Sequence, residues 1–258
     1  MHSTRYGSGK PLLLVHGLGA DGQSWQPVIS GLAAQRQVVA VDLPGFGQSP
    51  PLTGEVTIAS LTDAVEEFIA SEGLDGVDTV GSSMGGRMVL ELARRGVGGN
   101  AVDLDPDGFW TDGELRVFHY TLAPSIKLVL ALQPVMPALM GSPVGRTALL
   151  SQFSARPWAL SKDVALHEVR AFARATSLDA AFAALVHGPK QEGAPDGTTP
   201  GRVVIGWGRK DKVTLPRQAS RAQALFPDAS LHWFERSGHF PQWDEPAQTV
   251  EVILEATA

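Results

Sequence analysis

The sequence contains no cysteine. This absence excludes disulfide bonds, metal sites built on thiolates and a cysteine nucleophile. A chain without cysteine suits a reducing compartment, and its first ten residues, MHSTRYGSGK, lack the apolar core of a secretory signal. We therefore expect a cytoplasmic protein.

Basic clusters and long uninterrupted apolar runs are also missing. The net charge is −6, which disfavours nucleic acid or an anionic membrane as a partner. The most apolar stretch, Leu122 to Met140, includes Pro124, Pro134, Pro137 and Lys127. These residues would interrupt a transmembrane helix, which needs about 20 mainly apolar residues. We expect a small molecule as the partner, whereas no sequence signal indicates an oligomeric state.

What the sequence does contain is an alternation of short apolar runs and helical patterns. Of 258 residues, 43% are hydrophobic and 19% charged, which is typical of one globular domain of this size. The apolar runs predict strands at 11–15, 37–41, 77–80, 100–104, 202–206 and 230–234. Helical patterns lie between or after them, at 24–34, 58–72, 84–95, 215–226 and 246–256. This order predicts an α/β fold with a mostly parallel central sheet flanked by helices.

One segment interrupts the alternation. Residues 106–188 contain several helix-like stretches and many prolines but no convincing strand. The turn-rich stretch at 189–201 then returns the chain to the sheet. We therefore divide the chain into a core domain of residues 1–105 and 189–258 and a helical insertion at 106–188.

The motif with the clearest chemical meaning is Gly81-Ser82-Ser83-Met84-Gly85, which matches G-x-S-x-G. A predicted strand precedes it and a predicted helix follows it, as a nucleophilic serine on a sharp turn requires. The N-terminus of the following helix also favours developing negative charge. Ser83 holds the central position, so we predict that Ser83 is the nucleophile and that Ser82 is structural.

A serine hydroxyl needs a base within hydrogen-bond reach and a carboxylate that orients the base. Asp211 follows the predicted strand at 202–206 and His239 follows the strand at 230–234. The chain order Ser, Asp, His is the one expected when the nucleophilic serine is at the centre of such a G-x-S-x-G turn. Because the carboxyl ends of parallel strands meet at one edge of a sheet, the three residues should converge there.

Other acids and histidines are weaker candidates. Asp211 could instead cap the helix near Leu215, and Asp103 and Asp105 close an earlier strand. We favour Asp211 because it sits in the sequence Trp-Gly-x-x-Asp. His16 is expected to be bonded within its own loop rather than to act as a base.

The oxygen of an attacked carbonyl becomes an anion and needs preorganised donors. We assign one donor to the backbone N–H of Met84, directly after the nucleophile. The second should come from the glycine-rich loop 16–19 after the first predicted strand, and we assign it to Leu18 N–H.

Five ordered segments, HGLGADGQSW, VDLPGFGQS, VGSSMGGRM, GWGRKD and SGHFPQWDEP, resemble the α/β-hydrolase superfamily. The resemblance covers nearly the whole chain outside the insertion. It implies the α/β-hydrolase fold with about seven to eight strands, a helical cap formed by the insertion, and no cofactor. The residues themselves show no metal-ligand spacing, so we expect no metal. Only residues 1–10 precede the first apolar run. This length is short for the leading antiparallel strands of the superfamily, so one of them is expected to be missing.

A serine nucleophile leaves four interpretations open. The first is a carboxylic ester hydrolase that forms an acyl-enzyme on Ser83. The second is a hydrolase of C–C bonds in vinylogous diketones, for which a cap arginine should bind the substrate; the candidates are Arg146, Arg156, Arg170 and Arg174. The third is a cofactor-free perhydrolase, and the fourth is a small-molecule receptor with this fold.

The apolar cap suggests a medium-sized, substantially apolar acyl or alcohol group. As residues that line the substrate pocket we predict Trp25, Phe109, Trp110, Met136, Met140 and Phe240.

Overall fold

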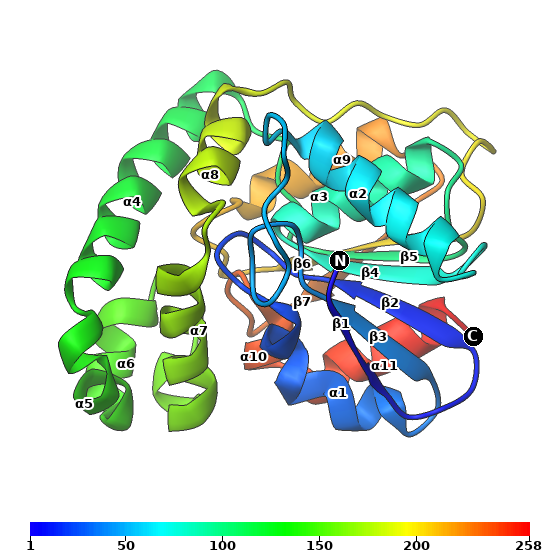
Figure 1. The fold of residues 1–258 in the computed structure, drawn as a ribbon. Coiled ribbons are helices and arrows are strands. Elements are labelled where there is room, and N and C mark those ends of the chain that lie inside the picture. Colours follow the sequence, from blue (N-terminus) through cyan, green and yellow to red (C-terminus); the bar gives the residue numbers. More distant parts are fainter.

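A computed structural model describes residues 1–258, and its centre is a seven-stranded sheet (Figure 1). The strand order is β1-β3-β2-β4-β5-β6-β7, and every neighbouring pair is parallel except β1 with β3. The strands are β1 (Ser3–Tyr6), β2 (Pro11–Val15), β3 (Gln37–Val41), β4 (Asp78–Ser82), β5 (Ala101–Leu104), β6 (Val203–Gly208) and β7 (Ser230–Phe234). The predicted α/β-hydrolase fold is confirmed.

All six predicted strands are present, each within two residues of its expected start. The leading antiparallel strand, β1, was not predicted from the sequence. Its residues, Ser-Thr-Arg-Tyr, are polar and half-exposed, so they carry no apolar pattern. Pairing with the edge of β3 places Ser3 opposite Val41 and Tyr6 opposite Val38.

Helices cover both faces of the sheet, because the inner strands are apolar on both sides. Leu12 and Leu14 of β2 face α1 and α11, while Leu13 and Val15 face the opposite layer. In Figure 1, α2, α3 and α9 lie on one side of the sheet and α1 and α11 on the other. These helices are α1 (Gln26–Ala33), α2 (Ile58–Ser71), α3 (Met84–Arg94), α9 (Ala219–Leu225) and α11 (Pro246–Ala256).

The segment between β5 and β6 holds five helices and no strand, and we call α4 to α8 the cap helices. They stand together at one end of the sheet (Figure 1). Their bounds are α4 (Asp112–Ala131), α5 (Met136–Gly141), α6 (Pro143–Leu150), α7 (Lys162–Arg174) and α8 (Leu178–His187). No single helix is long and apolar enough to cross a membrane; α4 and the segment Gln133–Gly141 would pass such a test only together, and they are bent by 62°.

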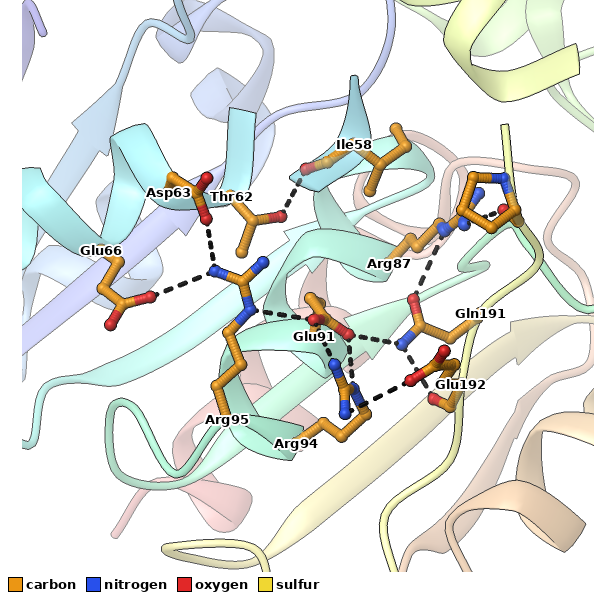
Figure 2. Close-up of polar contacts among 11 residues, drawn as sticks. Ile58, Thr62, Asp63, Glu66, Arg87, Glu91, Arg94, Arg95, Gln191 and Glu192 are labelled. Carbon is orange, nitrogen blue, oxygen red and sulfur yellow. Dashed lines mark hydrogen bonds and ion pairs between the residues drawn. The ribbon is translucent and has the colours of Figure 1, made fainter. Parts of the chain in front are cut away.

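After the last cap helix, the chain that returns to the sheet is held to α3 by polar contacts of Gln191 and Glu192 (Figure 2). Gln191 accepts a hydrogen bond from Arg87 Nε at 3.3 Å and donates one to Glu91 Oε2 at 3.1 Å. Glu91 also accepts from Arg94 and Arg95, at 2.8 and 2.9 Å. Glu91 is thus the shared acceptor that joins α3 to the returning segment.

We expect Glu91→Gln to destabilise the protein at pH 7 by about 1–2 kcal/mol, because the variant loses charge-assisted hydrogen bonds. Burial by itself would raise the pKa of Glu91, but its hydrogen bonds with Arg94, Arg95 and Gln191 outweigh burial and lower the pKa to about 2. A lowered folded-state pKa stabilises above the unfolded value of about 4.3. The difference between wild type and variant in urea unfolding should therefore shrink as the pH falls from 5 toward 3.

Glu192→Gln is the matched control. Glu192 contacts Arg94 at 3.4 Å, but its side chain is 74% exposed, so this exposed pair should contribute little. An equal loss of stability in both variants, or a Glu91→Gln effect that is the same at pH 7 and pH 3, would contradict this account.

Candidate active site

Ser83 lies on the sharp turn between β4 and α3. Its backbone has φ 55° and ψ −120°, a strained conformation for a residue other than glycine. A Cβ on Gly81 would lie 2.2 Å from the Gly85 carbonyl oxygen, and one on Gly85 would lie 2.2 Å from the Val15 oxygen. Both positions of the motif therefore need glycine, because the turn packs tightly on itself and on β2.

The structure brings Ser83, His239 and Asp211 together from the carboxyl ends of β4, β7 and β6. His239 Nε2 lies 2.9 Å from Ser83 Oγ, and His239 Nδ1 lies 2.9 Å from Asp211 Oδ2. The histidine and the aspartate are buried, whereas the serine is partly exposed. With Nδ1–H donating to the carboxylate, Nε2 is free to accept the serine proton, which is the arrangement that activates a nucleophile.

Asp211 is held by its own loop. Its Oδ1 accepts hydrogen bonds from the N–H groups of Val213 and Thr214, at 2.7 and 3.2 Å. Its Oδ2 accepts from Thr214 Oγ1 at 2.6 Å. The rotation of the carboxylate is therefore fixed, and Oδ2 is directed at His239. Sequence reasoning did not identify Thr214 as part of this arrangement.

Asp105, the rival acid, lies beside this group but is engaged elsewhere. Its Oδ1 accepts from the N–H of Gly208 at 2.8 Å, and it makes no hydrogen bond with His239. Burial, followed by the nearby Asp211 charge, raises the pKa of Asp105 well above its usual value and favours the neutral acid. Ligand atoms of Asp105, Asp211 and His239 lie within 4.8 Å of one another, so this group could also hold a metal ion.

The backbone N–H groups of Leu18 and Met84 lie near Ser83, and neither donates to any of the turn and loop acceptors of the protein. Met84 begins α3, and Leu18 follows Gly17, at which a Cβ would lie 3.2 Å from Ser83 Cβ. Both donors therefore come from segments that touch the serine. His16 supports the loop: its Nδ1 lies 2.8 Å from the Gly17 oxygen, and its Nε2 accepts from the Leu43 N–H at 3.0 Å.

A narrow apolar cavity lies between this site and the cap helices. Its free interior is about 30 Å³, and about 490 Å³ is reached only when the gaps between its lining atoms and the open solvent at its mouth are included. We call it the cap cavity. It adjoins the triad through Leu18, of the proposed oxyanion loop, and Phe240, whose ring centre is 4.7 Å from that of His239. The complete lining is Leu18, Ala20, Leu122, Ser125, Ile126, Val129, Leu150, Phe153, Glu168, Val169, Phe172, Phe240 and Trp243.

Of the six residues predicted to line the substrate pocket, only Phe240 lines the cap cavity. Trp25 lies beneath the opposite face of the sheet, in the cluster with Leu12 and Leu14. Phe109 and Trp110 are buried in the core, where they pack on Phe226 and Phe118.

Met136 and Met140 are fully buried among the cap helices, where they pack α5 against α7. The helical rotation turns both methionines into the cap's own core instead of toward the sheet. Leu122, Ile126 and Val129 of α4 line the cavity in their place.

Sequence reasoning also missed Asp244, which ties the histidine loop to the cap. Asp244 Oδ2 accepts from the N–H groups of Gly238 and Ala155, at 2.7 and 2.8 Å, and Oδ1 accepts from Ser154 Oγ at 2.5 Å. Asp244 therefore positions the residue next to His239. The signal was in SGHFPQWDEP, but an acid five residues after a histidine has no local pattern that reveals its partners.

Comparisons with known proteins bear on this fold and site. The model of the alpha/beta hydrolase family matches residues 12–252. An uncharacterised protein of Mycobacterium tuberculosis is 27% identical across 96% of this chain and 75% of its own length. A pimeloyl-[acyl-carrier protein] methyl ester esterase of Legionella pneumophila is 40% identical over 93 residues, which are 36% of each chain.

Among solved structures, the meta-cleavage product hydrolase of Pseudomonas fluorescens is similar in fold. Its TM-score is 0.74 at 21% identity, over 98% of this chain and 92% of that chain. The family model covers nearly all of the sequence, including the segments that carry Ser83, Asp211 and His239. The chain therefore belongs to the alpha/beta hydrolase family.

Proposed function

We propose that this protein hydrolyses carboxylic esters of small, substantially apolar substrates through an acyl-enzyme on Ser83. Ser83 Oγ attacks the ester carbonyl while His239 Nε2 takes the hydroxyl proton. The oxyanion accepts hydrogen bonds from the N–H groups of Leu18 and Met84. As the C–O bond to the alcohol breaks, His239 returns the proton to the leaving oxygen. A water molecule, deprotonated by His239, then releases the acid and restores Ser83.

The character of the cap cavity favours an uncharged ester over a C–C substrate. A C–C hydrolase of this family should present a cap arginine to its substrate, and no arginine lines the cap cavity. Arg146 donates hydrogen bonds to the backbone oxygens of Met140 and Trp158. Arg156 donates one to the backbone oxygen of Asp244. Arg174 lies 3.8 Å from Asp21, and Arg170 is exposed. An apolar cavity without a cation suits a neutral acyl chain.

The similarity to the Legionella methyl ester esterase supports the same choice, although it covers 36% of the chain. The similarity in fold to the Pseudomonas hydrolase is the reason to keep C–C hydrolysis as the second candidate.

Hydrolysis of p-nitrophenyl esters from acetate to laurate tests the proposal. We expect the highest kcat/KM on chains of roughly four to eight carbons, because the cap cavity is apolar but of limited volume. A fluorophosphonate should stop turnover by phosphonylating Ser83 with loss of fluoride, which adds the mass of its phosphonyl group to the peptide that contains Ser83. Activity that is greatest on acetate and falls steadily with chain length would contradict the assignment of the cap cavity as the acyl site. Hydrolysis of a vinylogous diketone without any ester turnover would instead support the C–C candidate.

A further inference from the structure

The cap cavity contains one carboxyl group, that of Glu168 on α7. Apart from Ser125 and Glu168, the residues that line this cavity are apolar. Glu168 is only 5% exposed, although it belongs to a helix whose other charged residues face solvent or partners outside the cavity. A carboxyl group in such a wall costs free energy unless it is well bonded, so its presence requires a reason.

The two oxygens of Glu168 differ in their partners. Oε2 accepts a hydrogen bond from Ser24 Oγ at 3.0 Å, which links α7 to the loop after β2. Oε1 has no hydrogen-bond partner in the protein, and this oxygen is not fully enclosed by protein atoms. Because Glu168 lines the cap cavity, Oε1 is the oxygen that would meet a molecule bound there.

The charged groups around Glu168 do not neutralise it. His167 Nε2 is directed at Asp21 Oδ1, at 2.7 Å, and Arg174 also pairs with Asp21, at 3.8 Å. Burial raises the pKa of Glu168 to about 7, although the neighbouring His167 and the Ser24 hydrogen bond partly oppose the shift. Near neutral pH the group is therefore present both as the acid and as the carboxylate.

We propose that Glu168 is a specificity-determining residue that hydrogen-bonds a hydroxyl group on the acyl chain of the ester. The proposal rests on ester hydrolysis as the function. The neutral acid can donate to a hydroxyl or accept from it, and the carboxylate can accept from it, so the contact survives in both states. The preferred substrates are then esters of hydroxy acids with an otherwise apolar chain.

Other polar groups fit this place less well. An ammonium group would bury a second charge, and one free oxygen cannot satisfy its three donors in an apolar wall. A substrate carboxylate would face the charged form of Glu168 without any cation in the cavity to offset the repulsion. A hydroxyl group brings neither cost.

The test compares methyl esters of ω-hydroxy acids and of plain alkanoic acids, each from four to eight carbons. Affinities are measured by calorimetry with Ser83→Ala, which binds the ester without cleaving it. The value of kcat/KM is measured with the active protein. At the best chain length we expect the hydroxy ester to bind about 10-fold more tightly than the alkanoate. In the Ser83→Ala background, Glu168→Leu should abolish this preference while the alkanoate binds as before or better. Glu168→Gln, which keeps a donor and an acceptor, should retain most of it.

Ser125→Ala is the matched control, because Ser125 is the other polar lining residue and is already bonded to Thr121 and Gln152. It should leave the hydroxyl preference unchanged. Equal binding of both ester series, no detectable binding of either, or an undiminished preference in Glu168→Leu would overturn the inference. If the hydroxyl preference in binding depends on Glu168 but no ester is turned over, recognition of the hydroxyl by Glu168 stands and ester hydrolysis is the claim that fails.

Discussion

Replacing Ser83 by alanine is expected to lower kcat for ester hydrolysis by a factor of about 10⁴ to 10⁶. The variant loses the oxygen proposed to form the acyl-enzyme, and His239 Nε2 then has no protein hydroxyl at 2.9 Å from which to take a proton. The fold should persist, because the Ser83 side chain makes no hydrogen bond other than the one with His239. Steady-state kinetics on the best p-nitrophenyl ester measure the loss of kcat, and a thermal unfolding curve shows whether the fold persists.

Ser82→Ala is a matched control one residue away. Ser82 is buried at the end of β4, and its Oγ accepts a hydrogen bond from Gln242 Nε2 at 3.1 Å without reaching His239. We expect this variant to keep kcat within about 10-fold of wild type. Turnover that persists in Ser83→Ala, or that disappears only in Ser82→Ala, would reject Ser83 as the nucleophile.

Asp211→Asn is the second change with a large expected effect, a loss in kcat of about 10³ to 10⁴. The amide oxygen of the asparagine should keep the place of Oδ1, because the N–H groups of Val213 and Thr214 donate there. The amide NH₂ would then face His239 Nδ1. A donor at this place makes Nδ1 the acceptor and puts the ring proton on Nε2, where the ring can no longer accept the proton of Ser83.

Asp105→Asn distinguishes the two acids that close neighbouring strands. Because burial raises the pKa of Asp105 and favours its neutral form, asparagine replaces it with a group of similar shape and charge. The amide oxygen can still accept the Gly208 N–H. We expect Asp105→Asn to lower kcat less than 10-fold, as an order of magnitude for a neutral hydrogen-bonded neighbour. If the loss in Asp105→Asn equals or exceeds that in Asp211→Asn, the assignment of the acid is wrong.

The features that could be predicted from the sequence are those specified by residues close together in the chain or by the order of the strands. The turn at Ser83 needs a strand, two close glycines and a helix, all within about twenty neighbouring residues. Asp211 and His239 follow apolar strands, and the carboxyl ends of parallel strands share one edge, so their convergence follows from the order of elements. For that reason the sequence predicts the six apolar strands and names the residues of the candidate triad.

The lining of the cap cavity could not be named in this way. An apolar residue on a cap helix can face the sheet, the cavity or the cap's own core, and its sequence environment is the same in each case. Met136 and Met140 face the cap's core, whereas Leu122 and Ile126 face the cavity, because the rotation of each helix is set by its packing partners.

Glu168 and Asp244 illustrate the same division for polar residues. Glu168 accepts a hydrogen bond from Ser24, which is 144 positions away in the chain. Asp244 accepts one from Ser154, which is 90 positions away. Each looks in the sequence like an ordinary acid on a solvated face. The sequence by itself determined the fold, the sharp turn at Ser83 and the chain order of the candidate triad, since local patterns and strand order specify them. Only the tertiary structure decided which side chains line the cavity and which groups bind the buried acids, because burial and pairing depend on contacts between segments far apart in the chain.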